Sequence, residues 1–109
     1  MAIQEISIDE LATKIESDPT LTLIDVREVD EYTDGHVAGA KLVVLGTVAD
    51  NVDAFRGGGS TYVICRSGGR SMRACEFLDA QGLDVVNIAG GTMGWIASGR
   101  DVVTGDQPS

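Results

Sequence analysis

The sequence predicts an α/β fold in which a parallel sheet has helices on both faces. Short runs rich in β-branched and aliphatic residues alternate with segments whose apolar residues recur at helical spacing, which is typical of parallel α/β sheets. The strand candidates lie at 3–6 (an edge strand), 21–26, 41–45, 61–64 and 84–88. A chain of 109 residues is long enough for one domain, which we place at residues 1–103 with a polar tail at 104–109.

Helices are predicted between these strands, at 8–16, 27–32, 48–55, 72–83 and 92–98. Ser7 and Glu10 form a capping-box pattern at the start of the first helix. Gly82 stands where a C-terminal cap belongs, and Trp95 is expected to anchor the last helix in the core. We expect the tail to fray beyond Val103.

The segment between the strand 61–64 and the helix 72–83 carries the chemistry: Cys65, Arg66, Ser67, Gly68, Gly69, Arg70 and Ser71. Amides at the start of a helix have no intrahelical partner and favour an anion, and a thiolate is an anion. The two glycines allow the loop to turn its amides inward, while Arg66 and Arg70 supply guanidinium groups that can grip an oxyanion. We therefore predict that Cys65 is a nucleophile and that residues 66–71 bind its sulfur and its substrate.

Other polar residues are assigned supporting or structural roles. Cys75 lies inside a predicted helix and is expected to pack in the core rather than act as a resolving cysteine. His36 is the only histidine and is expected to hydrogen-bond its own loop rather than serve as a general base. Asp25 and Arg27 end a strand, where we expect them to face opposite ways and fix neighbouring loops. We find no residues at metal-ligand spacing and predict no metal or cofactor.

Charge and composition narrow the partners. The net charge is −9, and residues 1–53 account for all of it, with twelve acidic and three basic residues. Such an acidic chain is a poor candidate for nucleic-acid binding, and no apolar run is long enough to span a membrane. The start of the chain lacks the features of a signal peptide, and two cysteines do not make a disulfide framework. We expect a cytoplasmic protein.

The chain resembles the rhodanese family, specifically its small single-domain members. Three blocks carry the resemblance, in family order: Leu23 to Glu28 followed by Glu31-Tyr32 and Gly35 to Ala40; Cys65 to Ser71; and Gly90-Gly91 with Gly94-Trp95. The resemblance implies a five-stranded parallel sheet and a cysteine that carries persulfide sulfur, which it maps onto Cys65. It also implies a sulfurtransferase that moves sulfane sulfur from thiosulfate or a persulfide donor to cyanide, a thiol or a protein cysteine.

Two alternatives remain beside the sulfurtransferase. One is a sulfur carrier or interaction module with little turnover of its own, because carriers use the same loop. The other is a small phosphatase or arsenate reductase, which the loop length disfavours: four residues separate Cys65 from Arg70, whereas those relatives use one more. The expected partners are a small anionic sulfur donor, attracted by Arg66 and Arg70 at contact distance, and a possible protein donor or acceptor.

Overall fold

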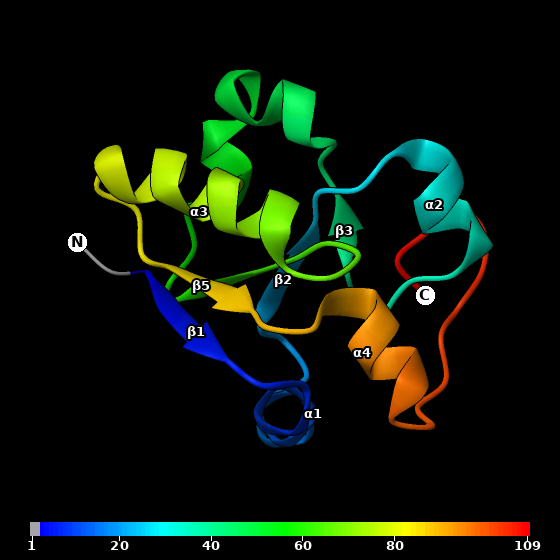
Figure 1. Cartoon of the computed structure of the whole chain (residues 1–109). Helices are drawn as coiled ribbons and strands as arrows, with labels where there is room; N and C mark the ends of the chain where they lie inside the picture. Colours follow the sequence, from blue (N-terminus) through cyan, green and yellow to red (C-terminus); the bar gives the residue numbers. More distant parts are fainter. Residues whose placement is uncertain (1–2) are drawn as a thin grey trace.

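The computed structural model describes residues 3–109 and contains a five-stranded sheet in the order β1-β5-β4-β2-β3, with all neighbouring strands parallel (Figure 1). The strands are β1 (Gln4–Ile6), β2 (Thr22–Asp25), β3 (Lys41–Leu42), β4 (Thr61–Ile64) and β5 (Val85–Ile88). The helices are α1 (Ile8–Ser17), α2 (Val29–Asp34), α3 (Gly69–Ala80) and α4 (Gly91–Ala97), with two 3-10 helices, η1 (Leu45–Asp50) and η2 (Val52–Phe55). The predicted α/β class with a five-stranded parallel sheet is confirmed.

The register of the sheet brings the ends of its central strands together. Asp25 of β2 lies opposite Ile64 of β4, and Val63 of β4 lies opposite Asn87 of β5. Because the strands are parallel, their carboxyl ends share one edge of the sheet, which is where ligands bind in folds of this kind. Cys65 follows β4 directly and therefore stands at this edge.

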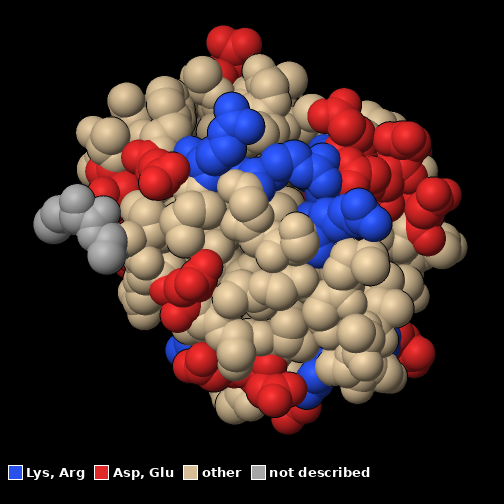
Figure 2. All heavy atoms as spheres, viewed as in Figure 1, with Lys and Arg blue, Asp and Glu red and all other residues tan. Residues whose placement is uncertain are grey.

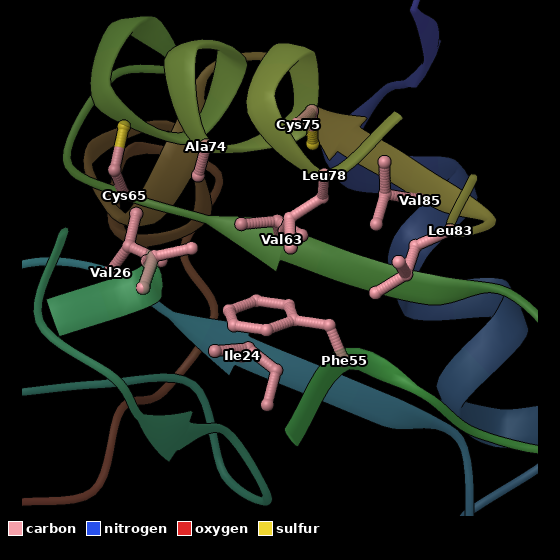
Figure 3. Packing of buried hydrophobic residues seen from close by; sticks show 11 residues of the cluster. Ile24, Val26, Phe55, Val63, Cys65, Ala74, Cys75, Leu78, Leu83 and Val85 are labelled. Atoms are coloured by element: carbon pink, nitrogen blue, oxygen red, sulfur yellow. The ribbon is translucent and has the colours of Figure 1, made fainter. Parts of the chain in front are cut away.

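Alternate side chains of each strand enter two separate hydrophobic cores. On the face covered by α3, η1 and η2, the buried side chains include Val63, Phe55 and Leu78 (Figure 3). On the face covered by α1 and α4, they include Leu11 and Trp95. Helices thus cover both faces, as the alternation of apolar residues along the strands requires. The indole Nε1 of Trp95 donates to the Asp101 carbonyl at 2.8 Å, and the predicted role as a core anchor is confirmed.

The segment from 41 to 55 departs from the prediction. The strand predicted at 41–45 ends at Leu42. The Val43 amide still donates to the Asp25 carbonyl of β2, and the Leu45 amide donates to the carbonyl of Val26, which follows β2. The single helix predicted at 48–55 is instead the pair of 3-10 helices, η1 and η2. The side chain of Asn51 donates to the Thr47 carbonyl, which competes with α-helical pairing of the backbone at this point.

The C-terminal tail makes hydrogen bonds that were not predicted from the sequence. It lies beside α2 (Figure 1), and the Gly39 amide donates to the Pro108 carbonyl at 2.9 Å. The His36 ring places Nδ1 at 2.8 Å from the Tyr32 carbonyl and Nε2 at 2.8 Å from the Gln107 carbonyl. The expectation that His36 bonds its own loop is confirmed, and the same ring holds the tail that we predicted to fray. Within residues 3–109, each helix is too short or too polar to cross a membrane.

Candidate active site

The loop that follows β4 encloses the sulfur of Cys65. The α3 helix begins at Gly69, three residues before the predicted start at Met72, so Ser71 lies in its first turn. Gly68 caps the helix with a φ of 113°, a left-handed conformation that a side chain with a Cβ resists. Its amide donates to the Cys65 sulfur at 3.1 Å. Of the two glycines in the loop, Gly68 needs this conformation, whereas Gly69 is part of the helix and has a negative φ.

Hydrogen bonds to the sulfur favour the thiolate form of Cys65. Burial raises the pKa of this thiol, because a charged sulfur loses its hydration inside the protein. The Ser71 hydroxyl, 3.3 Å from the sulfur, acts in the opposite direction, together with the amides of Ser71, Gly68 and Ser67. The hydrogen bonds outweigh burial, and the pKa of Cys65 lies below its ordinary value. The loop therefore stabilises a sulfur anion with fixed dipoles.

Cys75 has the opposite environment. It is buried on α3 and packs in the same core as Leu78, and its sulfur lies well apart from that of Cys65 (Figure 3). Burial, with a smaller contribution from the Asp79 carboxylate, raises the pKa of Cys75 to about 12. The thiol stays protonated and unreactive at neutral pH, and the predicted core role of Cys75 is confirmed.

The two arginines of the loop are in different states. Arg70 forms a bidentate ion pair with Glu31 of α2, with N···O distances of 2.7 and 2.8 Å. The hydrogen bond from Arg70 holds the pKa of Glu31 at about 2, so the pair is ionised at neutral pH. Within residues 3–109, the exposed Arg66 guanidinium makes no hydrogen bond or ion pair. Glu31 thus balances the charge of Arg70 in this structure, and the binding of an anionic donor by both arginines stays a prediction.

Basic and acidic side chains gather in two neighbouring areas of the surface around the loop. Figure 2 shows basic side chains gathered where α3 begins and acidic side chains gathered over α2 beside them. The chain as a whole carries −9, so this basic area is a local exception. An anion that approaches the loop meets positive charge only at short range.

Asp25 and Arg27 pair with each other. The prediction that they face opposite ways is wrong, because residues two apart in an extended chain point to the same side. The Arg27 guanidinium donates to both carboxylate oxygens of Asp25, with N···O distances of 3.0 Å to Oδ1 and 2.8 Å to Oδ2. It also donates to the Gly35 carbonyl at 2.8 Å. Both side chains are buried. The pair ties the end of β2 to the end of α2, which is the supporting role that we expected.

Residues of β5 and of the start of α4 hold the backbone of the loop by hydrogen bonds. The Thr92 amide and hydroxyl donate to the Cys65 carbonyl at 2.8 and 3.0 Å, and the Asn87 side chain reaches the Gly68 carbonyl at 3.3 Å. A Cβ on Gly91 would lie 2.5 Å from the Arg66 carbonyl oxygen, so only glycine permits this contact. Sequence reasoning missed Thr92 and Asn87; the Gly90-Gly91 pair before a helix was the available signal of a close approach.

Comparison with known proteins agrees with this architecture. The model of the Rhodanese-like domain matches residues 7–98. "Putative sulfurtransferase YtwF" of Bacillus subtilis is 42% identical over 95 residues, which cover 87% of this chain and 92% of that protein. "Putative sulfur carrier protein YrkF" of the same organism is 35% identical over 86% of this chain, which spans only 51% of YrkF. A crystal structure of a rhodanese-like domain protein from Staphylococcus aureus superposes with a TM-score of 0.80 at 34% identity, covering 85% of this chain and 91% of that one.

A parallel α/β sheet with a cysteine at its carboxyl edge, held by backbone amides and a serine hydroxyl, is the architecture that these comparisons share with the chain. The chain belongs to the rhodanese-like domain family. The names of its relatives support sulfur transfer as the general activity.

Proposed function

We propose that this protein is a sulfurtransferase that carries sulfane sulfur on Cys65, taking it from thiosulfate or a persulfide and passing it to a thiophilic acceptor. The observation that carries the proposal is the set of hydrogen bonds aimed at the Cys65 sulfur from Gly68 and Ser71. The second cysteine, Cys75, has no such environment and a pKa of about 12.

In the first half of the reaction, the Cys65 thiolate attacks the outer sulfur of thiosulfate. The S–S bond of the donor breaks, and its electron pair leaves with sulfite. Cys65 exposes only 1% of its surface, which favours a donor whose reactive sulfur is terminal and unhindered. The exposed Arg66 offers the anionic donor a cation, while Arg70 remains paired with Glu31.

In the second half, an acceptor thiolate or cyanide attacks the outer sulfur of the Cys65 persulfide. The new S–S bond, or S–C bond for cyanide, forms as the persulfide bond breaks, and the electron pair returns to the Cys65 sulfur. The amides of Gly68 and Ser71 that stabilise the thiolate also stabilise it as a leaving group. Because a covalent intermediate separates the halves, the kinetics should be ping-pong.

The test is intact mass spectrometry after incubation with thiosulfate and removal of excess donor. We expect one added sulfur atom on the wild type and on Cys75→Ser, and none on Cys65→Ser. Addition of cyanide should then remove that atom and release thiocyanate. A sulfur atom retained by Cys65→Ser, or absent from Cys75→Ser, would contradict the assignment.

A sulfur carrier is the second candidate, and the similarity to YrkF favours it. A carrier takes up one sulfur atom per Cys65 but turns over slowly with small molecules. Steady-state thiocyanate production distinguishes the two: a sulfurtransferase sustains rapid release over many equivalents, whereas a carrier releases thiocyanate only slowly. Both outcomes use Cys65, so the mass experiment and the turnover experiment answer separate questions.

A further inference from the structure

Asn87 is a buried polar side chain at the end of β5 that contacts the cysteine loop. It is paired in register with Glu5 of β1 and with Val63 of β4, so it lies on the face of the sheet that α3 covers. It exposes none of its surface, and within residues 3–109 its Oδ1 has no hydrogen-bond partner. A buried amide whose oxygen is unpaired costs stability, which an apolar side chain in this core would avoid. Asn87 is therefore a candidate for a role in the site.

Two contacts fix the orientation of the Asn87 amide group. Its Nδ2 lies 2.7 Å from the Glu5 carboxylate and 3.3 Å from the Gly68 carbonyl oxygen. A carboxylate and a carbonyl oxygen accept hydrogen bonds and do not donate them, so both contacts require the nitrogen of the amide. The nitrogen carries two protons, one for each of these acceptors. Glu5 thus holds Asn87 in the orientation in which it donates to the loop.

The Gly68 carbonyl oxygen has three donors within reach. Besides Asn87 Nδ2, the Met72 amide lies at 3.1 Å and the Ser71 hydroxyl at 3.3 Å. A carbonyl oxygen has two lone pairs, so two donors are enough to fill it. The Met72 amide and Asn87 together supply these two donors. The Ser71 hydroxyl is then free to donate its proton elsewhere.

The Ser71 hydroxyl has one proton and two acceptors. Its oxygen lies 3.3 Å from the Cys65 sulfur and 3.3 Å from the Gly68 carbonyl oxygen. The proton can be donated to only one of these acceptors at a time. Burial raises the pKa of the Cys65 thiol and the hydrogen bond from Ser71 lowers it, so the acceptor that receives the proton matters for the sulfur.

We propose that Asn87 is a positioning residue that directs the Ser71 proton to the Cys65 sulfur, because it occupies the competing acceptor, the Gly68 carbonyl. Asn87 acts on the sulfur through Ser71. Without the Asn87 amide, the carbonyl has an open lone pair that competes with the sulfur for the proton, and the thiolate loses part of its stabilisation. The inference rests on the proposed function of Cys65 and adds to it a residue that controls the state of the nucleophile.

The experiment measures the pH dependence of Cys65 alkylation by iodoacetamide, in a Cys75→Ser background and with no sulfur donor present. Asn87→Leu, which removes the amide with little change in side-chain size, is compared with Asn87 in two settings: with Ser71 present and in Ser71→Ala. This double-mutant cycle separates the role of the proton from a general loosening of the loop, because loosening acts whether or not Ser71 is present. The assay involves no sulfur transfer, so it reads the inference even if the proposed function fails in the mass experiment.

With Ser71 present, we expect Asn87→Leu to move the titration midpoint of Cys65 upward by about 0.3 to 1 unit, which is a roughly two- to tenfold loss of thiolate below the midpoint. In Ser71→Ala, the same substitution should leave the midpoint in place. No shift with Ser71 present, or an equal shift in both settings, would overturn the inference. If circular dichroism shows that Asn87→Leu does not fold, the cycle is repeated with Asn87→Ala. Failure of both variants to fold would also overturn the inference, because Asn87 would then be required for the fold itself.

Discussion

Replacing Ser71 with alanine should raise the pKa of Cys65. The Ser71 hydroxyl is buried, lies 3.3 Å from the sulfur and is one of the groups that favour the thiolate against the effect of burial. Without the hydroxyl, the amides must oppose burial alone, and the thiolate loses one donor. The direction of the change is therefore upward, toward the ordinary value of a thiol or above it.

The size of the change follows from the strength of one hydrogen bond to a charged group. Such a bond contributes ~1.5–3 kcal/mol, which at 1.36 kcal/mol per unit corresponds to a rise of about one to two pKa units. A less acidic thiol is intrinsically more nucleophilic, with a Brønsted coefficient of ~0.4–0.5. At a pH below both pKa values, the two effects combine to a net fall in thiol reactivity of roughly 3- to 15-fold.

The assay is the rate of alkylation by iodoacetamide as a function of pH, measured in a Cys75→Ser background so that a single thiol reacts. Ser67→Ala is the matched control, because its hydroxyl is on the same loop and forms no hydrogen bond with the Cys65 sulfur. The titration midpoint should move upward in Ser71→Ala and stay in place in Ser67→Ala. An unchanged or lower midpoint in Ser71→Ala, or an equal shift in both variants, would refute the reasoning.

Three further predictions concern the ion pair, the glycine contact and the free arginine. The folded-state pKa of Glu31, about 2, lies below its ordinary 4.5, so its contribution to stability is present above pH 4.5 and is lost toward pH 2. Glu31→Gln should therefore lower the free energy of urea unfolding by ~1–2 kcal/mol at pH 7. The difference between the variant and the wild type should shrink as the pH falls from 4.5 toward 2, and a difference that stays constant would contradict the prediction. Gly91→Ala should destabilise the fold by ~2–4 kcal/mol, whereas Gly69→Ala, which has open space, should be nearly neutral in thermal unfolding. Raising salt should lower kcat/KM for thiosulfate, and Arg66→Ala should flatten that dependence; a rate that rises with salt would show that the overall charge of −9 dominates.

The core of the site was predictable from sequence because its determinants are close together in the chain. A strand, a cysteine, two glycines and a helix start lie within a short stretch, and each leaves its own local signal. The same holds for the capping box. The Ser7 hydroxyl accepts a hydrogen bond from the Glu10 amide, and the Glu10 carboxylate accepts one from the Ser7 amide, both at 3.1 Å. α3 ends at Ala80 with Gln81 as its C-cap, and Gly82, which follows with a φ of 85°, supplies the glycine expected at this end of the helix. Local hydrogen bonding and backbone conformation can be inferred from neighbouring residues alone.

The missed features depend on residues far apart in the chain. Glu31 and Arg70 are separated by 39 positions, and His36 and Gln107 by 71. No periodicity of apolar residues encodes which acidic side chain meets which arginine, because that choice is made by the packing of α2 against the loop. The error at Asp25 and Arg27 has another origin, since the strand alternation itself requires that they share a face.

The position of β5 has a consequence for how this protein matures during synthesis. β5 lies between β1 and β4, so Gln4 of β1 waits for Val86 before it gains its partner. At ~5–20 residues per second, a ribosome takes roughly 4–16 s to make the intervening chain. Thr92, which secures the Cys65 carbonyl, emerges later still. Until then the nascent chain carries Cys65 without the contacts from β5 and Thr92, so the loop gains its full set of hydrogen bonds only after residue 92 has been made.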